Sequence, residues 1–552
     1  MTGTGLAEDH RINLKRGTLM ETLRIGPAPL HLGAEQFMVP MRDGTRLATD
    51  VYLPPSPGRH PVVVSRMPYD KASAWMAIDR IAPRYLERGY VFVAQDVRGK
   101  FRSEGETVPF VHEIEDTYDT LDWVVGQPWS DGAVAMTGDS YHGYTQWAGA
   151  AGGHPALRAI APRVTGTGIS DMLLAGRVSC LYQASYFAHM WVDRDIHYYE
   201  TDWSVRPLRE VFEPAFSAIG ARSAAVDAML AGRPLVNPFA SRHPFTASPV
   251  PVLHRVGWFD NLIDLSMRDH SAQLATPAWR DLAYLDADAC DHHTYHLAQA
   301  PVAPADDHAL DVTLLERVLP RYLGRTLDFF DVFVRGTRPV TSLSRATWFQ
   351  GHDGERTAGE WPPRETVELL LHPSGSALTP TPETGARVVR WTHDPADPVP
   401  SIVKDPWVFL HEYPDESPLH DRPDVVVFTG EPTGRPLDLT GPVNAVVAVE
   451  TDAPSMHLFV KLHDVAPDGS AHMICRGQAL ITGTSGVRVD LGHTGYRLRP
   501  GHRLRLVLSC SDYPLFAPHP GTDEDPWSAT VTRPSVQTLR PAATSLSLAV
   551  TP

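Results

Sequence analysis

The sequence predicts an α/β protein with a parallel sheet, an inserted helical cap and a C-terminal β-sandwich of the jelly-roll kind. In the N-terminal half, short β-branched runs alternate with helical stretches, which is typical of a doubly wound sheet. Residues 166–244 interrupt this alternation with helical stretches rich in aromatic side chains. After residue 346, several runs alternate strictly between apolar and polar side chains, which indicates an all-β domain.

These differences divide the 552 residues into five segments. We expect a polar N-terminal arm over 1–34, followed by the first part of the α/β domain over 35–165. The cap covers 166–244, the second part of the α/β domain covers 245–345, and the sandwich covers 346–552.

The strands of the α/β domain are near-continuous apolar runs, as expected where both faces of a parallel sheet are buried. A hairpin over 36–53, with its turn at Asp43-Gly44, precedes them. We expect parallel strands at 61–66, 90–97, 133–138, 159–164, 250–258 and 282–289. The expected helices lie at 73–88, 113–126, 141–152 and 319–336.

Composition narrows the classes of function. With 49 Lys+Arg against 65 Asp+Glu, the net charge is -16, which argues against nucleic acid as a partner. We see neither a signal peptide nor an apolar run of membrane-spanning length, and therefore expect no membrane span and a cytoplasmic location. None of the cysteines belongs to a C-x-x-C pair, so we expect buried free thiols at Cys180, Cys290, Cys475 and Cys510.

The strongest local motif is G-D-S-Y-H-G, residues 138–143, between an expected strand and an expected helix. A serine on such a turn is the nucleophile elbow of an α/β hydrolase, and the next backbone N–H points at the developing oxyanion. This predicts Ser140 as the nucleophile and the N–H of Tyr141 as an oxyanion donor. The common motif has glycine two residues after the serine, where this chain has His142. The alternative is an ordinary turn serine.

In this fold the acid and the histidine follow the serine in chain order, each after a later strand. The strand 250–258 leads to Asp260, the candidate acid, which could also cap the next helix; Asp264 is a second candidate. The strand 282–289 leads to His292 and His293, one of which is the expected base. A metal site is a weaker alternative for this cluster, with the candidate ligands Cys290, His292, His293 and His296.

At this point the chain resembles the cocaine-esterase family, which is related to the X-prolyl dipeptidyl peptidases and the α-amino-acid ester hydrolases. The resemblance runs from about residue 35 to the end. Its matching stretches include MRDGTRLATDVYLP, SRMPYDK, RGYVFVAQDVRGKFRSEGE, GDSYHGYTQWAGA, GWFD, RPDVVVFTGEP and GHRLRLVLSCSDYPLFAPHPGT. The resemblance implies an α/β-hydrolase domain, a helical cap and a jelly roll.

The resemblance also implies roles for particular residues. It implies a triad of Ser140, Asp260 and His292. The family's G-P-W-x-H motif around the histidine is absent here, so His293 remains an alternative to His292 as the base. It further implies that the hydroxyl of Tyr69, in the Pro68-Tyr69 pair, completes the oxyanion hole with the N–H of Tyr141. A homodimer is compatible with the resemblance.

We expect substrate choice to favour an apolar or aromatic acyl group, held by Trp258, Phe259 and Leu262 together with aromatic residues of the cap. Plain core packing is the alternative for these side chains. The resemblance implies a comparison with the α-amino-acid ester hydrolases, which have carboxylates shortly after the catalytic Asp. The matching positions of this chain are Leu262 and Ile263. Apolar side chains cannot neutralise a buried ammonium, which argues against amino-acyl substrates.

The predicted function is therefore hydrolysis of a small-molecule ester or amide through an acyl-enzyme, with no metal or organic cofactor. Three alternatives remain open. The first is an X-prolyl peptidase. The second is a biosynthetic acyltransferase or cyclase that uses the same triad. The third is a non-enzymatic protein in which the jelly roll binds glycans.

Overall fold

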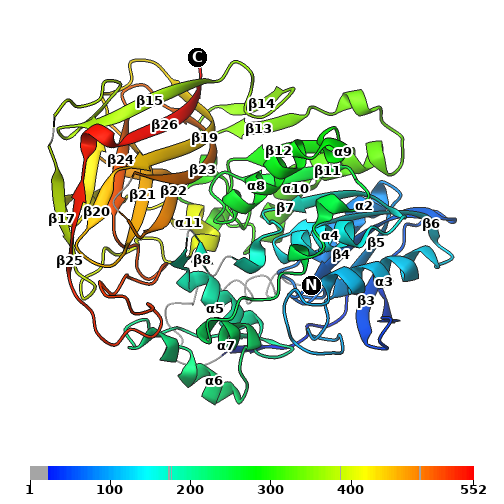
Figure 1. Cartoon of the computed structure of the whole chain (residues 1–552). Coiled ribbons are helices and arrows are strands. Elements are labelled where there is room, and N and C mark those ends of the chain that lie inside the picture. Colours follow the sequence, from blue (N-terminus) through cyan, green and yellow to red (C-terminus); the bar gives the residue numbers. More distant parts are fainter. Residues whose placement is uncertain (1–22, 172–173, 176, 386, 484–485) are drawn as a thin grey trace.

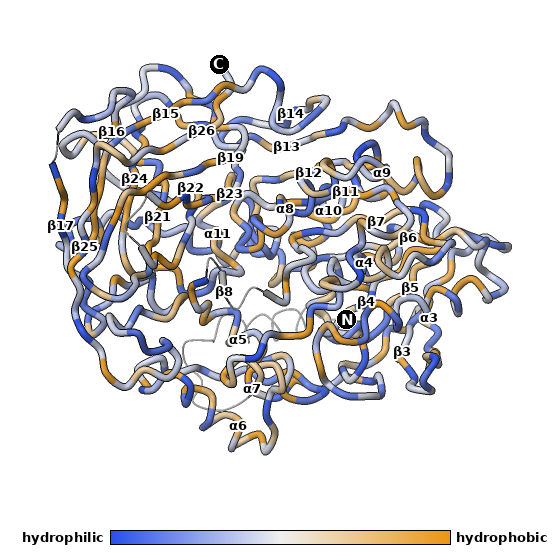
Figure 2. Tube along the Cα trace, viewed as in Figure 1, coloured by the Kyte–Doolittle hydropathy of each residue, from blue (hydrophilic) through white to orange (hydrophobic). Residues whose placement is uncertain are grey.

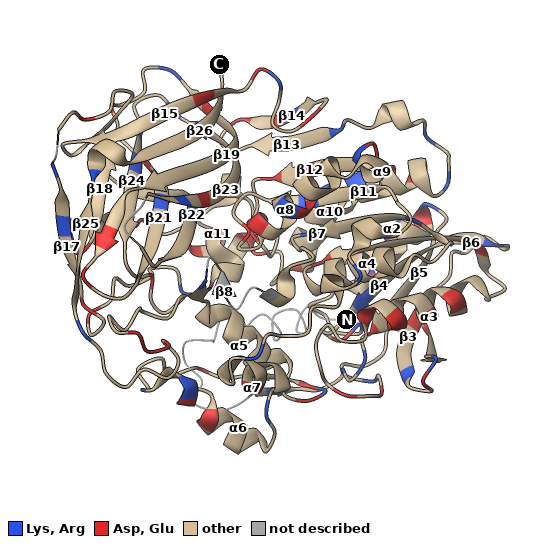
Figure 3. Ribbon diagram, in the orientation of Figure 1, with Lys and Arg blue, Asp and Glu red and all other residues tan. Residues whose placement is uncertain are grey.

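The computed structural model describes residues 23–552, apart from 172–173, 176, 386 and 484–485 (Figure 1). Figure 1 shows an α/β part and a β-rich part side by side, with a smaller group of helices below both. Figure 2 shows apolar segments along the strands of both large parts, which therefore each contain a hydrophobic core. In Figure 3, acidic and basic segments occur in all three parts.

The α/β part is built on a ten-stranded sheet with the order β14-β13-β12-β11-β7-β6-β4-β5-β3-β2. The seven strands from β13 to β5 in this order are parallel, and antiparallel hairpins flank them at both edges. The strands are β2 (Glu35–Pro40), β3 (Arg46–Tyr52), β4 (His60–Met67), β5 (Val91–Asp96), β6 (Ser130–Asp139), β7 (Leu157–Arg163), β11 (Val252–Gly257), β12 (Ala283–Asp288), β13 (Ala346–Gln350) and β14 (Gly354–Ala358). Every residue of β5 and β11 is buried, as the apolar runs predict.

Helices pack on this sheet in two groups. In one group, α2 (Ile78–Glu87) contacts α10 (Val312–Phe333). In the other, α3 (Glu113–Val125) contacts α4 (Tyr141–Gly152), while α8 (Ile263–Ala275) contacts β11 and β12. This arrangement is that of a doubly wound sheet.

The expected start of the sandwich at residue 346 is wrong, because β13 and β14 belong to the central sheet. β13 pairs in parallel with β12, and β14 closes the sheet as an antiparallel edge strand. β13 is almost fully buried and β14 is half-exposed, and the pattern of a strand does not indicate which sheet it joins, so periodicity alone does not assign these strands to a domain.

The cap contains α5 (Leu181–Met190), α6 (Glu213–Ile219) and α7 (Ala224–Leu230). It also holds the short strand β10 (Ile196–Tyr198), which pairs with β1 (Leu23–Ile25) of the N-terminal arm. The arm is thereby bound to the cap, although its residues 1–22 lie outside the described residues. Lys100, from the α/β part, is buried and donates to the carbonyls of Met190, Asp193 and Asp195. These bonds fix the cap on the α/β domain.

The C-terminal part is a jelly-roll sandwich. A nine-stranded sheet has the order β22-β21-β24-β18-β16-β15-β26-β19-β23, and a three-stranded sheet has the order β17-β25-β20. A Cβ atom at Gly477 on β22 would lie 2.1 Å from the carbonyl oxygen of Asp490 on β23, so the two ends of the larger sheet approach each other. The strands are β15 (Val367–Ser374), β16 (Ala377–Thr379), β17 (Val389–His393), β18 (Val426–Thr429), β19 (Leu437–Val447), β20 (Val449–Thr451), β21 (Met456–Val465), β22 (Ala471–Ile481), β23 (Val487–Leu498), β24 (Arg503–Ser509), β25 (Ser535–Leu539) and β26 (Ser545–Thr551).

A short helix of this part, α11 (Phe409–Glu412), lies between β17 and β18 in the chain and contacts the α/β domain. Within the part of the chain that the structure describes, no helix is both long enough and apolar enough to cross a membrane.

Candidate active site

Ser140 occupies a strained turn between β6 and α4, with φ 55° and ψ -121°. Such a backbone conformation in a non-glycine residue is costly and is found at functional sites, and here it fits a nucleophile elbow. A Cβ atom at Gly138 would lie 2.4 Å from Cβ of His142, and one at Gly143 would lie 2.3 Å from Cγ2 of Thr165. Glycine is therefore needed at 143, one residue later than in the common motif, for α4 to approach the loop after β7.

Asp260 and His292 follow the neighbouring parallel strands β11 and β12. Nδ1 of His292 lies 2.8 Å from Oδ1 of Asp260, and both side chains are buried. The two turns are also joined through the backbone, because the N–H of Phe259 donates to the carbonyl of Cys290 at 3.0 Å. Of the two histidines that the sequence left open, His292 is the one bonded to Asp260, whereas the ring of His293 lies 5.9 Å from that of Trp75.

Asp291 connects the His292 loop to the C-terminal part, and sequence reasoning missed it. Its Oδ2 accepts the N–H of Leu410 at 2.9 Å, and its Oδ1 accepts the N–H groups of His293 and Tyr295. Burial raises the pKa of this carboxyl well above its usual range. No local pattern marks Asp291, because its partner in α11 lies 119 residues along the chain.

Tyr69 lies in the loop after β4, with its hydroxyl 3.1 Å from that of Tyr186 in the cap. Burial raises the pKa of Tyr69 to about 12, against a smaller lowering by the neighbouring side chains of Tyr186 and Ser140 and the backbone of Tyr141. The phenol is therefore protonated at neutral pH and can donate. The side chain of Tyr141 points away and donates to Glu113, so only its backbone faces Tyr69.

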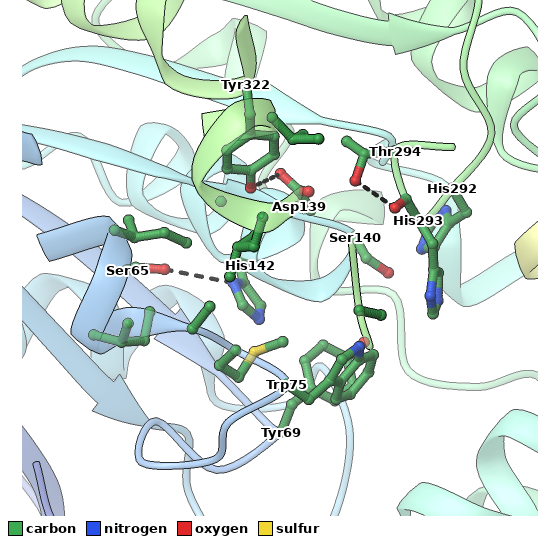
Figure 4. A pocket seen from close by; sticks show the side chains of 18 of the residues that line it. Ser65, Tyr69, Trp75, Asp139, Ser140, His142, His292, His293, Thr294 and Tyr322 are labelled. Atoms are coloured by element: carbon green, nitrogen blue, oxygen red, sulfur yellow. Dashed lines mark hydrogen bonds between the residues drawn. The ribbon is translucent and has the colours of Figure 1, made fainter. Parts of the chain in front are cut away.

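These groups share one cavity of about 210 Å³, shown in Figure 4. Ser140, His292 and Tyr69 all line it, together with residues of the cap, of α2 and of α10. In Figure 4, Ser140 lies between His292 on one side and His142 and Ser65 on the other. Trp407, from the C-terminal part, closes over His292 with an edge-to-face ring contact at 4.6 Å. All three parts of the molecule thus contribute to the cavity.

The predicted acyl-binding residues Trp258, Phe259 and Leu262 do not line this cavity, and that prediction is corrected. The ring of Trp258 stacks on Trp361 at 5.1 Å, and that of Phe259 stacks on Phe409 at 6.0 Å. Leu262 is 1% exposed and belongs to the core of the α/β part. The two aromatic rings lie in the contact between β11 and the C-terminal part, where they line a second cavity together with Asp260.

The side chains considered as metal ligands in the sequence bind different partners. Cys290 accepts a hydrogen bond from Arg163 at 3.3 Å, His296 lies 3.4 Å from Asp288, and His292 is bonded to Asp260. Over the described residues, no group of three or more Cys, His, Asp or Glu side chains is arranged to hold a metal ion.

Residues 43–274 match the family model of the X-Pro dipeptidyl-peptidases (S15 family). Residues 339–546 match the model of the X-Pro dipeptidyl-peptidase C-terminal non-catalytic domain. The chain is 30% identical to the cocaine esterase of Rhodococcus sp. (strain MB1 Bresler) over 548 residues, which cover 88% of this chain and 91% of that one. It is 25% identical to a putative serine esterase of Mycobacterium bovis over 579 residues, with the same shares covered, 88% and 91%.

Solved structures share the whole fold. An α-amino acid ester hydrolase superposes with a TM-score of 0.76 at 22% identity, covering 94% of this chain and 96% of that one. An aminopeptidase from a marine sediment archaeon, Thaumarchaeota archaeon, gives a TM-score of 0.73 at 22% identity, with the same coverage, 94% and 96%. The fold is that of the α/β hydrolases. Within that class, the chain belongs to the cocaine-esterase family of serine hydrolases.

Proposed function

We propose that the protein is a serine esterase that hydrolyses carboxylic esters with an apolar acyl group through an acyl-enzyme. One observation carries this proposal: Ser140, on its strained turn, lines the same cavity as His292, which is bonded to the buried Asp260. A nucleophile, a base and a group that orients the base are the elements of nucleophilic acyl transfer.

In the proposed mechanism, Nε2 of His292 takes the proton of Ser140 as Oγ attacks the ester carbonyl. Asp260 holds Nδ1 and thereby fixes the tautomer and stabilises the imidazolium. The carbonyl oxygen becomes an oxyanion that accepts hydrogen bonds from the Tyr69 hydroxyl and the Tyr141 N–H. The leaving alcohol takes the proton from His292 and leaves the acyl group on Oγ of Ser140. His292 then takes a proton from water as the water attacks the acyl carbon, and it returns this proton to Oγ as the acyl–Oγ bond breaks and the acid is released.

The cavity supports an ester rather than an amino-acyl peptide as substrate. The carboxylate that lines it is that of Asp139, and Arg163 at 2.7 Å and the Tyr322 hydroxyl at 2.8 Å already occupy it. A substrate ammonium placed there would compete with a buried guanidinium. This favours esterase over X-prolyl aminopeptidase activity.

The test is hydrolysis of p-nitrophenyl esters and of an Ala-Pro p-nitroanilide by the purified protein, each against Ser140→Ala. We expect ester turnover that disappears in the variant, with Ser241→Ala on the exposed surface as the matched control. Turnover of the anilide alone would replace the proposal with a peptidase. Ester turnover that survives in Ser140→Ala would remove Ser140 from the mechanism.

A further inference from the structure

The cavity continues beyond Ser140 into a space between α2 and α10, which we call the inner lobe. Apolar side chains form its walls: Ile78 and Ile81 from α2, Phe92 from β5, and Leu315, Leu319 and Leu323 from α10. The inner lobe and the nucleophile belong to one continuous cavity.

The end of the inner lobe that Phe92 lines lies away from His292. Ser140 directly follows β6, and β12, which precedes His292, lies three strands away from β6 on one side. β5, which carries Phe92, lies two strands away on the other side. Because His292 must reach the leaving alcohol, the alcohol departs toward the β12 side. The acyl substituent is then directed to the opposite side, where the inner lobe lies.

Two hydroxyls at the wall of the inner lobe are bonded to neighbouring side chains, whereas Nε2 of His142, which also lines the cavity, is buried without a hydrogen-bond partner among the described residues. The hydroxyl of Tyr85 donates to Thr137 at 3.2 Å, and that of Tyr322 donates to Asp139 at 2.8 Å. An apolar ligand therefore leaves these hydroxyls satisfied, whereas a charged group would be buried against carbon. Apart from His142, the chemistry of the wall matches a hydrocarbon chain.

We propose that the inner lobe holds the acyl chain of the substrate, and that the preferred substrates are esters of aliphatic acids longer than butyrate. This inference rests on the proposed esterase activity. Each added methylene that enters the lobe raises kcat/KM by about fourfold until the lobe is filled. Ile81 and Leu319, from the two helices, set the usable length.

The first experiment is a series of p-nitrophenyl acetate, butyrate, hexanoate and octanoate with the wild-type protein. We expect kcat/KM for hexanoate to exceed that for acetate by roughly 10²-fold if all four added methylenes enter the lobe. Equal values for all four esters, or a maximum at acetate, would overturn the inference. If no ester is turned over and Ser140 is not acylated, the proposed function itself fails, which is a distinguishable result.

The second experiment narrows the lobe with Leu319→Trp and, separately, Ile81→Trp. The hexanoate-to-acetate ratio of kcat/KM should fall by about tenfold or more in each variant, because the indole occupies the space of the chain. The matched control is Leu86→Trp, which changes a half-buried residue of α2 outside the cavity and should keep the wild-type ratio. An unchanged ratio in both folded lobe variants would overturn the inference. Should either variant fail to fold, the wild-type series still decides.

Discussion

Asp291 accepts a hydrogen bond from the backbone N–H of Leu410 at 2.9 Å, and this bond joins the His292 loop to the C-terminal part. The same carboxyl group accepts the N–H groups of His293 and Tyr295, so three backbone donors converge on one buried side chain. Trp407 lies over His292 from the same segment of the C-terminal part. The position of His292 therefore depends on a domain that lies outside the α/β fold.

Asp291→Asn tests this dependence. The amide nitrogen of asparagine cannot accept, so at least one of the three N–H groups loses its partner, at a cost of about 1–3 kcal/mol in the free energy of unfolding. We expect kcat to fall by about tenfold because His292 is less well placed. Denaturant unfolding and ester hydrolysis measure the two effects. Asp397→Asn, at a side chain 77% exposed, is the control and should change neither.

The two adjacent histidines can be separated by kinetics. His292→Ala should lower kcat by roughly 10⁴–10⁶-fold, as loss of a catalytic base does in a serine hydrolase. His293→Ala should cost less than about tenfold, because its ring contacts Trp75 and Asp260 is bonded to His292. If His293→Ala proves the more damaging substitution, the base lies one residue further along the chain.

Tyr69→Phe tests the oxyanion hole. Removal of the hydroxyl should lower kcat by about 10²–10³-fold with little effect on KM, since the bond to the oxyanion forms only in the transition state. Tyr186→Phe removes the neighbouring hydroxyl, 3.1 Å away, and should have a much smaller effect. Because the pKa of Tyr69 is about 12, its ionisation should not reduce activity up to about pH 10. A Tyr69→Phe variant with wild-type kcat would contradict this role.

Substitution of Asp264, the second candidate acid, should stabilise the protein rather than lower its activity. Burial raises the pKa of Asp264 to about 7 from an ordinary value of 3.8, so the folded protein holds this carboxyl protonated at pH values where the unfolded chain ionises it. The resulting destabilisation is absent below about pH 4, grows between about pH 4 and 7 and is complete above pH 7.

Asp264→Asn should therefore be more stable than the wild type at pH 8, with a difference that shrinks toward pH 4. Melting temperatures of both proteins across this range measure it. The variant should also keep its esterase activity, whereas Asp260→Asn should lose most of it. A stability difference that is independent of pH would contradict the raised pKa, and loss of activity in Asp264→Asn would return it to the candidate acids.

Much of the site could be predicted because it depends on strand order. The apolar runs locate β6, β11 and β12, and the residues that follow them, Ser140, Asp260 and His292, meet at one edge of the sheet. What could not be predicted is the direction of side chains beyond a strand end. Trp258 and Phe259 directly precede the candidate acid Asp260 in the sequence but face the C-terminal part.

Contacts between segments that are distant in the chain could not be predicted from the sequence either. The bond from Leu410 to Asp291 and the ring of Trp407 over His292 need the sandwich to be docked before they exist. The inner lobe arises in the same way, because it forms only where α2 and α10 lie together against the sheet. Neither helix shows by its sequence alone which of its apolar residues border a cavity.

The proposed mechanism requires Ser140 to be the nucleophile that becomes acylated. The most direct measurement treats the protein with an alkyl fluorophosphonate, in which the serine oxygen bonds to phosphorus as fluoride leaves, and maps the label by peptide mass spectrometry. We predict a single phosphonylated peptide containing Ser140, loss of esterase activity in proportion to labelling, and no label in Ser140→Ala. Labelling of another residue, or full esterase activity after complete labelling of Ser140, would contradict the account.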